Sequence, residues 1–300
     1  MKPILIPLKQ DRPGFEKFIG AWFCPGDPSV VVDVGPSRSV GLLIQCLREL
    51  AIEKVDIVLL THIHVDHAGG LAEFLHAFPM ARVICHGKAI GHLIEPDKLW
   101  IGTRKALGEL AFMYGPISPV ERDRLIPHTE AHVPGITVIE TPGHAPHHLC
   151  FVCKANLFAG EAGGVYLRAG GLEYLRPATP PIFFLKEFLE SVDRLILQGD
   201  LPIYYSHFGR ADASRLMLQR ARDQLLLWDA VASEESSNDY SDVDDLIERC
   251  VERLLKEDLE LKAINVMAPD DRARELFFLK NSMKGCLMGH LQDRSSHSLK

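Results

Sequence analysis

Four side chains that can bind metal ions fall within six consecutive positions of the segment LLTHIHVDHAGGL: His62, His64, Asp66 and His67. Imidazole and carboxylate groups are the usual protein ligands of zinc and other first-row divalent metals. These four residues follow an apolar run and precede a glycine pair. A turn at the end of a strand can therefore direct alternate side chains into one pocket. Desolvating four such groups without a partner would be costly. We therefore expect a metal site here.

Three later positions repeat this placement of a ligand-type residue directly after a predicted strand. They are His144 in ETPGHAPHH, Glu161 in LFAGEAGG and His207 in IYYSHFG. Open α/β sheets place ligand sites where strands give way to loops. Each residue would be ambiguous alone, but together they can complete a site that the first segment begins. Isolated histidines are instead interpreted as surface or hydrogen-bonded structural groups, namely His76, His86, His92, His128 and His132.

The elements that must position these residues alternate between strand-like and helix-like patterns. Residues 29–35 (SVVVDVG) and 55–62 (VDIVLLTH) are aliphatic runs that predict strands, with a helical apolar spacing between them. Two further strands close together in sequence are predicted within residues 135–161, and a last short one within residues 200–209. The pattern predicts a layered α/β fold over residues 1–210. Residues 211–300 predict helices without a strand or ligand cluster, which indicates a helical C-terminal extension.

Composition limits the classes of function. The chain has 300 residues, 47% of them hydrophobic and 24% charged, with a formal net charge of −7, which does not favour nucleic acid as a partner. No run of about 18 apolar residues predicts a membrane span, and no secretion signal is evident, so we expect a cytoplasmic protein without membrane association. The seven cysteines are an odd number, typical of reduced thiols. Cys150 and Cys153 have C-x-x-C spacing, but they fall in one predicted strand and are interpreted as core residues on opposite faces.

The order of the ligand-type residues resembles that of the metallo-β-lactamase-fold hydrolase superfamily, whose signature is H-x-H-x-D-H followed by a distal His, an acidic bridge and a final His. The resemblance covers roughly residues 1–210 and implies a four-layer αββα sandwich with two divalent metal ions at one edge. It implies that the first metal is bound by His62, His64 and His144, the second by Asp66, His67 and His207, and that Glu161 is shared by both. Family members usually have aspartate at the bridge. The glutamate found here has one more methylene group, which should lengthen its reach.

The stretch TPGHAPHHLCF is similar to the T-P-G-H-x-x-x-H stretch of glyoxalase II-like thioester and ester hydrolases. The resemblance implies that His148 supports the site from outside the ligand set. The segment after Glu161 does not contain the residues that recognise glutathione thioesters, so a true glyoxalase II is not expected. Four residues of that segment are candidates to line a substrate pocket, the alternative being exposed loop residues: Tyr166, Arg168, Tyr174 and Arg176.

The function that the resemblance implies is metal-dependent hydrolysis. Two cations would lower the pKa of a bridging water from about 15.7 toward about 7, and the resulting hydroxide would attack an ester, thioester or lactone carbonyl of a small molecule. Asp66 would orient the water and accept its proton. Zinc is the expected metal, with iron or manganese as alternatives. Three other readings stay open: a non-catalytic metal-binding protein, a redox protein with a di-iron centre, and a nuclease of the same superfamily. The acidic balance of the chain argues against the nuclease. The helical extension is expected to cover the pocket or form a homodimer contact.

Overall fold

Two β-sheets dominate the computed structural model, which describes residues 2–181 and 183–297. The first sheet has the strand order β1-β2-β3-β4-β5-β6 and the second β13-β12-β9-β8-β7. The strands of the first sheet are β1 (Ile4–Pro7), β2 (Gly20–Cys24), β3 (Val30–Val32), β4 (Ile57–Leu59), β5 (Arg82–Cys85) and β6 (Leu125–Pro127). Those of the second are β7 (Ile136–Glu140), β8 (Leu149–Cys153), β9 (Asn156–Gly160), β12 (Ile203–Tyr205) and β13 (Gly209–Ala211).

The central strands of both sheets are buried on both faces, and alternate residues enter different cores. In β3, Val30 and Val32 belong to the apolar cluster between the sheets, whereas Val31 belongs to the cluster on the outer face. In β8, Cys153 faces the other sheet and Cys150 faces outward. This is the period-two alternation of a strand. It confirms that the C-x-x-C pair consists of two buried residues on opposite faces of one strand.

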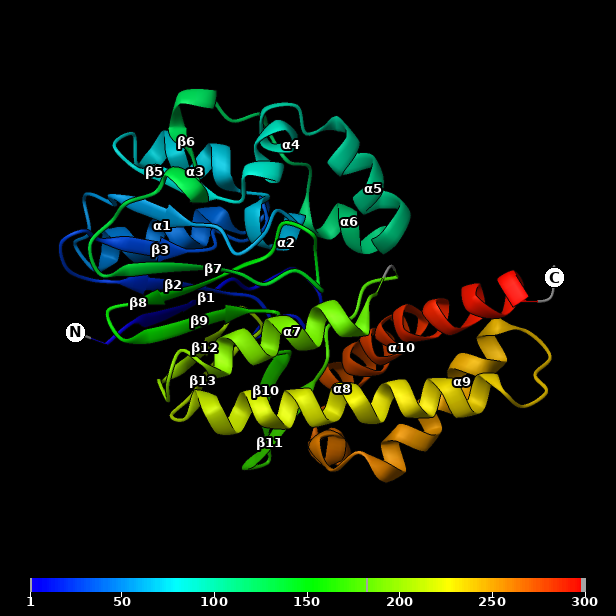
Figure 1. The fold of residues 1–300 in the computed structure, drawn as a ribbon. Coiled ribbons are helices and arrows are strands. Elements are labelled where there is room, and N and C mark those ends of the chain that lie inside the picture. Colours follow the sequence, from blue (N-terminus) through cyan, green and yellow to red (C-terminus); the bar gives the residue numbers. More distant parts are fainter. Residues whose placement is uncertain (1, 182, 298–300) are drawn as a thin grey trace.

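Helices cover the outer face of each sheet (Figure 1). On the first sheet lie α1 (Val40–Glu49), α2 (Val65–Ala68), α3 (Leu71–Ala77) and α4 (Ile90–Ile94). Beside them, α5 (Asp97–Leu107) packs on α4 and on α6 (Glu109–Tyr114). On the second lie α7 (Leu185–Ile196) and α8 (Ser214–Ser236). The inward side chains of α1 and α7, such as Leu43 and Val192, are fully buried. The layers therefore run helix, sheet, sheet, helix, and the predicted αββα sandwich is confirmed.

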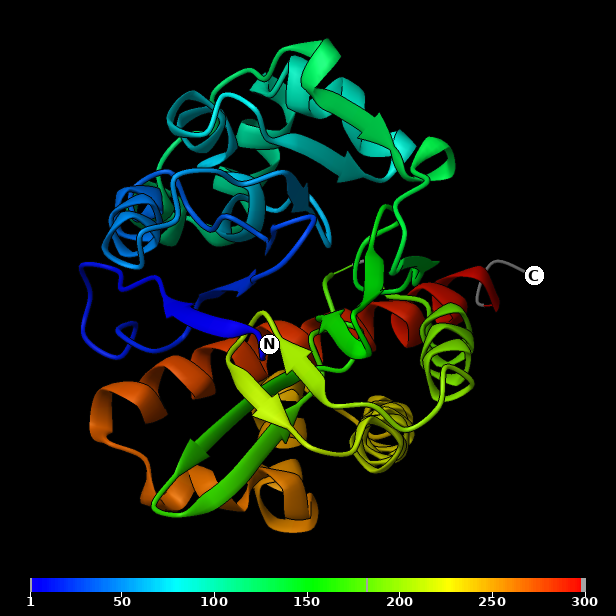
Figure 2. The same ribbon diagram turned by 90° about the vertical axis from the view of Figure 1, so that its left-hand side faces the viewer.

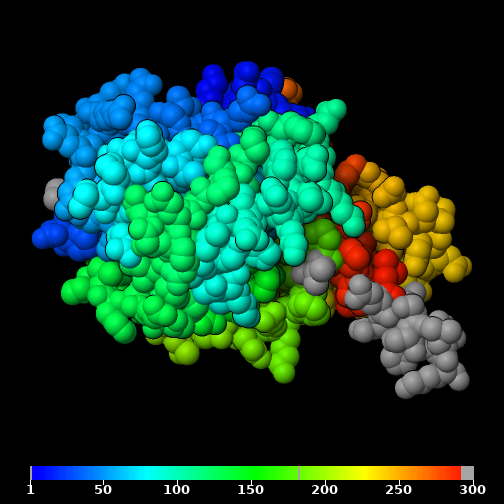
Figure 3. All heavy atoms as spheres, turned by 90° about the horizontal axis from the view of Figure 1, so that it is seen from above, coloured from blue at the N-terminus to red at the C-terminus, as the bar shows by residue number. Residues whose placement is uncertain are grey.

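The described part of the chain after Ala211 is helical. Besides α8 it contains α9 (Val243–Glu257), a 3₁₀ segment (Leu259–Val266) and α10 (Pro269–His297). In Figure 3, α9 (gold) and the later part of α10 (red) lie together at one end of the molecule. The helices after Ala211 do not form a separate core, because Trp228 and Met283 belong to the same apolar cluster as Val58 of β4. A hairpin of β10 (Val165–Ala169) and β11 (Leu172–Arg176) packs against the 3₁₀ segment.

Among the described residues, none of the helices combines the length and the apolar character that crossing a membrane requires.

Candidate metal centre

The predicted ligands meet at one edge of the sandwich because parallel strands end there. β3, β4 and β5 are parallel neighbours in the first sheet, and β9 and β12 are parallel in the second. His62 follows β4, Glu161 follows β9 and His207 follows β12, so each lies just past the carboxyl end of its strand. Carboxyl ends of parallel strands share one edge of a sheet. The fold thus brings together residues that are up to 145 positions apart, from 62 to 207.

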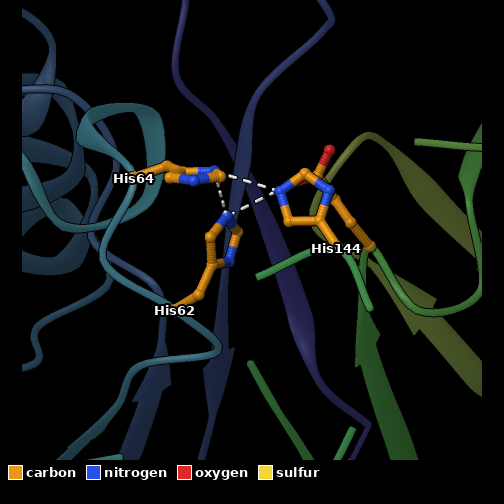
Figure 4. Close-up of side chains that lie close together, drawn as sticks. His62, His64 and His144 are labelled. Carbon is orange, nitrogen blue, oxygen red and sulfur yellow. Dashed lines mark hydrogen bonds and ion pairs between the residues drawn. The ribbon is translucent and has the colours of Figure 1, made fainter. Parts of the chain in front are cut away.

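The first group consists of three histidines whose ring nitrogens point toward one another (Figure 4). His64 Nδ1 lies 3.0 Å from His62 Nε2 and 3.0 Å from His144 Nε2. Glu161 adds a carboxylate oxygen, Oε2, at 2.9 Å from His144 Nε2 and 3.2 Å from His62 Nε2. Three nitrogens and one oxygen converging on one point are suited to a four-coordinate divalent metal.

The second group lies beside the first and consists of Asp66, His67 and His207. Asp66 Oδ2 is 3.6 Å from His67 Nε2 and 3.4 Å from His207 Nε2. Glu161 reaches this group as well, with Oε2 at 3.5 Å from His67 Nε2 and Oε1 at 3.7 Å from His207 Nε2. Its carboxylate therefore lies between the two groups, as a shared ligand requires.

The hydrogen bonds on the far side of each ring fix which nitrogen is free to bind a metal. Nδ1 of His144 donates to the carbonyl of Ala178 at 2.9 Å, and Nδ1 of His207 donates to the carbonyl of Phe18 at 3.1 Å. A carbonyl oxygen can only accept, so both rings carry their proton on Nδ1 when neutral. Their Nε2 lone pairs then face the centre of the site, the arrangement of metal-ligating histidines. The residues present fit a pair of metal ions.

His67 gives the clearest case of a nitrogen without a partner. Its Nδ1 lies 3.0 Å from Asp33 Oδ2, whereas its Nε2 is buried and has no hydrogen-bond partner among the described residues. An unpaired buried polar atom is costly. A metal ion at the second group would satisfy it.

The electrostatics of the cluster favour the cation-binding forms of His64, Asp66 and Glu161. Burial, reinforced by the neighbouring His144, lowers the pKa of His64 to about 3. Burial opposes ionisation of Asp66, but His67 and His207 outweigh it and lower its pKa to about 2. Burial likewise opposes ionisation of Glu161, yet His144 holds its pKa well below the usual range. Burial also opposes protonation of His67 and His144, but Asp66 and Glu161, respectively, outweigh it and raise the pKa of these two rings, which must lose a proton to bind a metal. Deprotonated ligands are what metal binding requires.

Asp33 is a functional residue that the sequence analysis missed. It is buried at the end of β3 and accepts hydrogen bonds from the Thr61 amide, the Thr61 hydroxyl and the Ser206 hydroxyl, besides holding His67. Thr61 Oγ1 in turn lies 3.0 Å from His62 Nδ1. Asp33 thus orients ligands of both groups. A carboxylate closing the otherwise apolar run SVVVDVG was the available signal.

His148 lies behind the ligands, where the sequence analysis expected a supporting residue. Its Nδ1 is 2.8 Å from Thr141 Oγ1, and its Nε2 accepts the Glu161 amide at 3.1 Å. The ring therefore fixes the main chain that carries the bridging glutamate. Gly160 makes this contact possible, since it has φ +51° and a Cβ there would approach His148 Nε2 to 2.5 Å.

A third cluster, His86, His128 and Glu140, also contains ligand-type residues. Here, however, Nδ1 of His86 accepts the Lys88 amide and Nδ1 of His128 accepts the Gly87 amide. Each neutral ring must then carry its proton on Nε2, which donates toward Glu140 rather than offering a lone pair. His128 Nε2 lies 2.8 Å from Glu140 Oε1. The cluster is a hydrogen-bonded connection between the two sheets, in agreement with the structural reading of these histidines.

Three of the four candidate pocket residues are buried, namely Tyr166, Tyr174 and Arg176. Arg168 is exposed on β10, and the Tyr166 hydroxyl donates to Glu173 at 2.7 Å. Tyr174 and Arg176 are buried, and Arg176 forms an ion pair of 2.6 Å with Glu275 of α10. This corrects our expectation for Tyr174 and Arg176, because β11 turns them toward the C-terminal helices. Arg168 is exposed, as the alternative expected, but it lies on a strand and not in a loop.

The first two-thirds of the chain are similar in sequence to known proteins. The sequence model of the metallo-beta-lactamase superfamily matches residues 21–207. A metallo-beta-lactamase fold-containing protein of Sulfurisphaera tokodaii is 30% identical over 195 residues, which cover 62% of this chain and 70% of that protein. A hydroxyacylglutathione hydrolase of Shewanella baltica is 28% identical over 185 residues, covering 61% of this chain and 54% of that enzyme. The chain thus spans only about half the length of the hydroxyacylglutathione hydrolases it matches.

Solved structures share the fold over nearly the whole chain. An archaeal metallo-beta-lactamase superfamily protein of Sulfolobus tokodaii superposes with a TM-score of 0.67 at 23% identity, covering 95% of this chain and 97% of that one. A metallo-beta-lactamase family protein of Thermus thermophilus gives 0.62 at 22% identity, covering 98% and 94%. Coverage this high extends beyond residue 211, so the C-terminal helices are part of the shared fold.

Proposed function

This chain belongs to the metallo-beta-lactamase superfamily, and on that premise we propose that it is a metal-dependent hydrolase that cleaves an ester, thioester or lactone bond of a small molecule. The observation that carries the proposal is the position of Glu161, whose carboxylate contacts both groups of converging ligands. A shared carboxylate between two sets of ligands is the arrangement of a two-metal hydrolytic site. We propose zinc as the metal, with iron or manganese as alternatives that the same ligand types accept.

When bound, divalent metal ions lower the pKa of a coordinated water and polarise a carbonyl oxygen. The residues of this chain supply the rest. Asp66 keeps 17% of its side chain exposed, whereas His67 and His207 beside it keep only 1% and 3%. Asp66 is therefore the ligand best placed to hold an entering water by one oxygen and to take up its proton. Asp33 and His148 do not reach the reacting atoms and act by holding His67 and Glu161 in place.

The choice of bond class is supported by relatives named hydroxyacylglutathione hydrolase, a name that denotes hydrolysis of an acylated glutathione, and by the match of TPGHAPHHLCF to thioester and ester hydrolases. Hydrolysis of a carbonyl bond also suits the composition of the site. Its converging residues, as far as the structure describes them, are metal ligands and a carboxylate, with no nucleophilic hydroxyl or thiol among them.

The test is hydrolysis of a panel of esters, thioesters and lactones by the metal-loaded protein. The variant His64→Ala removes the nitrogen at the centre of the first group, so we expect it to lose metal from that group and to lose turnover by several orders of magnitude. The exposed His76→Ala is the matched control and should retain both. Turnover by wild-type protein in metal-free buffer would contradict the proposal. Full metal loading without turnover of any panel compound would favour the non-catalytic reading instead.

A further inference from the structure

We propose that one face of the C-terminal helix α10 orients the metal ligands, because it holds in place the two main-chain carbonyls to which His207 and His144 donate. The inference rests on the proposed function and deepens it, since it assigns the extension a part in building the metal centre. Figure 2 shows α10 (orange to red) running across the molecule beneath the N-terminal segment (blue).

The first carbonyl belongs to Phe18, which holds His207 in two ways. Its oxygen accepts His207 Nδ1 at 3.1 Å, and its ring lies 4.5 Å from the imidazole centroid at an interplanar angle of 30°. Phe18 lies between β1 and β2 in a segment that is neither helix nor strand. Its position therefore has to be fixed by contacts with other elements.

Those contacts come from α10. Phe278 stacks on Phe18 with centroids 5.1 Å apart at 22°, and the Arg274 guanidinium lies 4.5 Å from the Phe18 ring centroid. Arg274 also donates to the carbonyl of Gly14, in the same irregular segment. Gly14 packs so closely on the start of α10 that a Cβ there would lie 2.6 Å from the Asp270 carbonyl oxygen. α10 thus contacts this segment at two places, Gly14 and Phe18.

The second carbonyl belongs to Ala178, which accepts His144 Nδ1 at 2.9 Å. It lies in the segment that leaves β11, again outside any helix or strand. The next residue, Thr179, donates to the Ser282 carbonyl of α10 at 2.7 Å. Gly285 lets the two backbones approach closely, because a Cβ there would collide with the Pro180 carbonyl oxygen. This segment, too, is fixed by α10.

The four helix positions involved form one face. Arg274, Phe278, Ser282 and Gly285 follow the i, i+4, i+8, i+11 spacing that places side chains in one row along a helix. In the N-terminal half of the row, Arg274 and Phe278 contact Phe18, whose carbonyl accepts from His207 of the second group. In the C-terminal half, Ser282 and Gly285 contact the segment of Ala178, whose carbonyl accepts from His144 of the first group. The two ends of the row can therefore be tested separately.

A buried charge network holds the N-terminal half rigid. Glu275 is fully buried between Arg274 at 2.8 Å and Arg176 at 2.6 Å, and the Arg176 guanidinium lies 5.1 Å from the Phe278 ring centroid. Buried ion pairs contribute little net stability over apolar residues of similar volume. The network instead holds Arg274 against the ring of Phe18 and Arg176 against the ring of Phe278.

The experiment is a titration of metal-free protein with Co²⁺, followed by calorimetry and by the visible spectrum of each site. We expect Phe278→Leu to weaken Co²⁺ binding at the second group by at least about tenfold with the first unchanged, in the range found for residues that orient metal ligands. We expect Gly285→Ala to weaken Co²⁺ binding at the first group and to leave binding at the second group unchanged. Phe112→Leu, at a position of α6 with 59% exposure, is the control and should change neither.

Thermal unfolding of the metal-free variants checks that each one folds. Should Phe278→Leu fail to fold, Arg274→Lys takes its place, since it keeps the charge and loses the planar contact with Phe18. Should Gly285→Ala fail to fold, Thr179→Val takes its place, since it removes the hydrogen bond to Ser282.

The inference would be overturned if the folded variant of the N-terminal half and the folded variant of the C-terminal half both bound Co²⁺ at both sites with wild-type affinity. An equal loss at both sites in every variant would also overturn it. A wild-type protein that binds no Co²⁺ would instead defeat the proposed function.

Discussion

Ring orientation separates two kinds of histidine in this chain. His144, His207 and His67 donate from Nδ1 to oxygen atoms and turn a lone pair inward, whereas His86 and His128 accept amide protons at Nδ1 and donate outward from Nε2. The residue types are identical, and only the atoms behind each ring differ. Whether a histidine of this chain can bind a metal ion thus depends on the hydrogen bond that its Nδ1 atom makes.

Asp33 offers a test at this scale. Replacing it with Asn keeps the shape but removes the charge that favours Nδ1–H on His67, and its amide group cannot accept at both former oxygen positions. We expect Asp33→Asn to weaken metal binding at the second group by about 10- to 100-fold. Calorimetric titration with Zn²⁺ measures this. Asp56→Asn, in a carboxylate bound to Ser29 on the surface, is the control, and equal affinities in the two variants would contradict the assigned role.

At the scale of elements, strand ends explain why the ligands could be found in the sequence. His62, Glu161 and His207 each follow an apolar run that ends in a turn, and that pattern is local. The Asp33 network and the two orienting carbonyls could not be found this way. They arise from contacts such as that between Phe18 and His207, which are 189 positions apart and leave no periodic signal. Tyr174 and Arg176 were misplaced for the same reason, since Glu275, the partner of Arg176, lies on a distant helix.

The connection between sheets formed by His86 and Glu140 predicts a pH effect on stability. Burial, together with His128, lowers the pKa of His86 below its ordinary value of 6.5. The unfolded chain therefore binds a proton near pH 6.5 that the folded chain does not. This favours unfolding as the pH falls, so the contribution of His86 to stability is present above pH 6.5 and is lost below it.

Replacing His86 with Gln removes the titrating group. Between about pH 7.5 and 5.5, we expect the free energy of unfolding of metal-free His86→Gln to fall less than that of the wild type. Urea unfolding at both pH values measures the difference. His76→Gln, at an exposed position, should follow the wild type. Parallel pH dependence in wild type and His86→Gln would show that His86 does not act in this way.

At the scale of the whole molecule, the C-terminal helices share the main apolar core, and α10 contacts the segments behind the ligands. The division at residue 210 that the sequence predicts marks a change from strands to helices, but the core continues across it. Whether the extension also forms a homodimer contact stays a prediction.

Metal removal should destabilise the whole chain, because the ligands come from both sheets and only the folded state brings them together. A ligand that binds the folded state alone stabilises it by about 4 kcal/mol when its free concentration is about 1,000 times Kd. We expect chelation to lower the thermal midpoint clearly and re-addition of Zn²⁺ to restore it. An unchanged midpoint after verified metal removal would mean that the site contributes nothing to holding the sheets together.

We expect two metal ions to lie between the two groups of ligands joined by Glu161, and the metal content per chain measures this. After loading with Zn²⁺ and removal of excess metal, elemental analysis should give two ions per wild-type chain. It should give no more than one for His207→Ala, which removes one nitrogen of the second group. A wild-type value of one or zero, or two ions retained by His207→Ala, would show that the two groups do not each hold a metal ion.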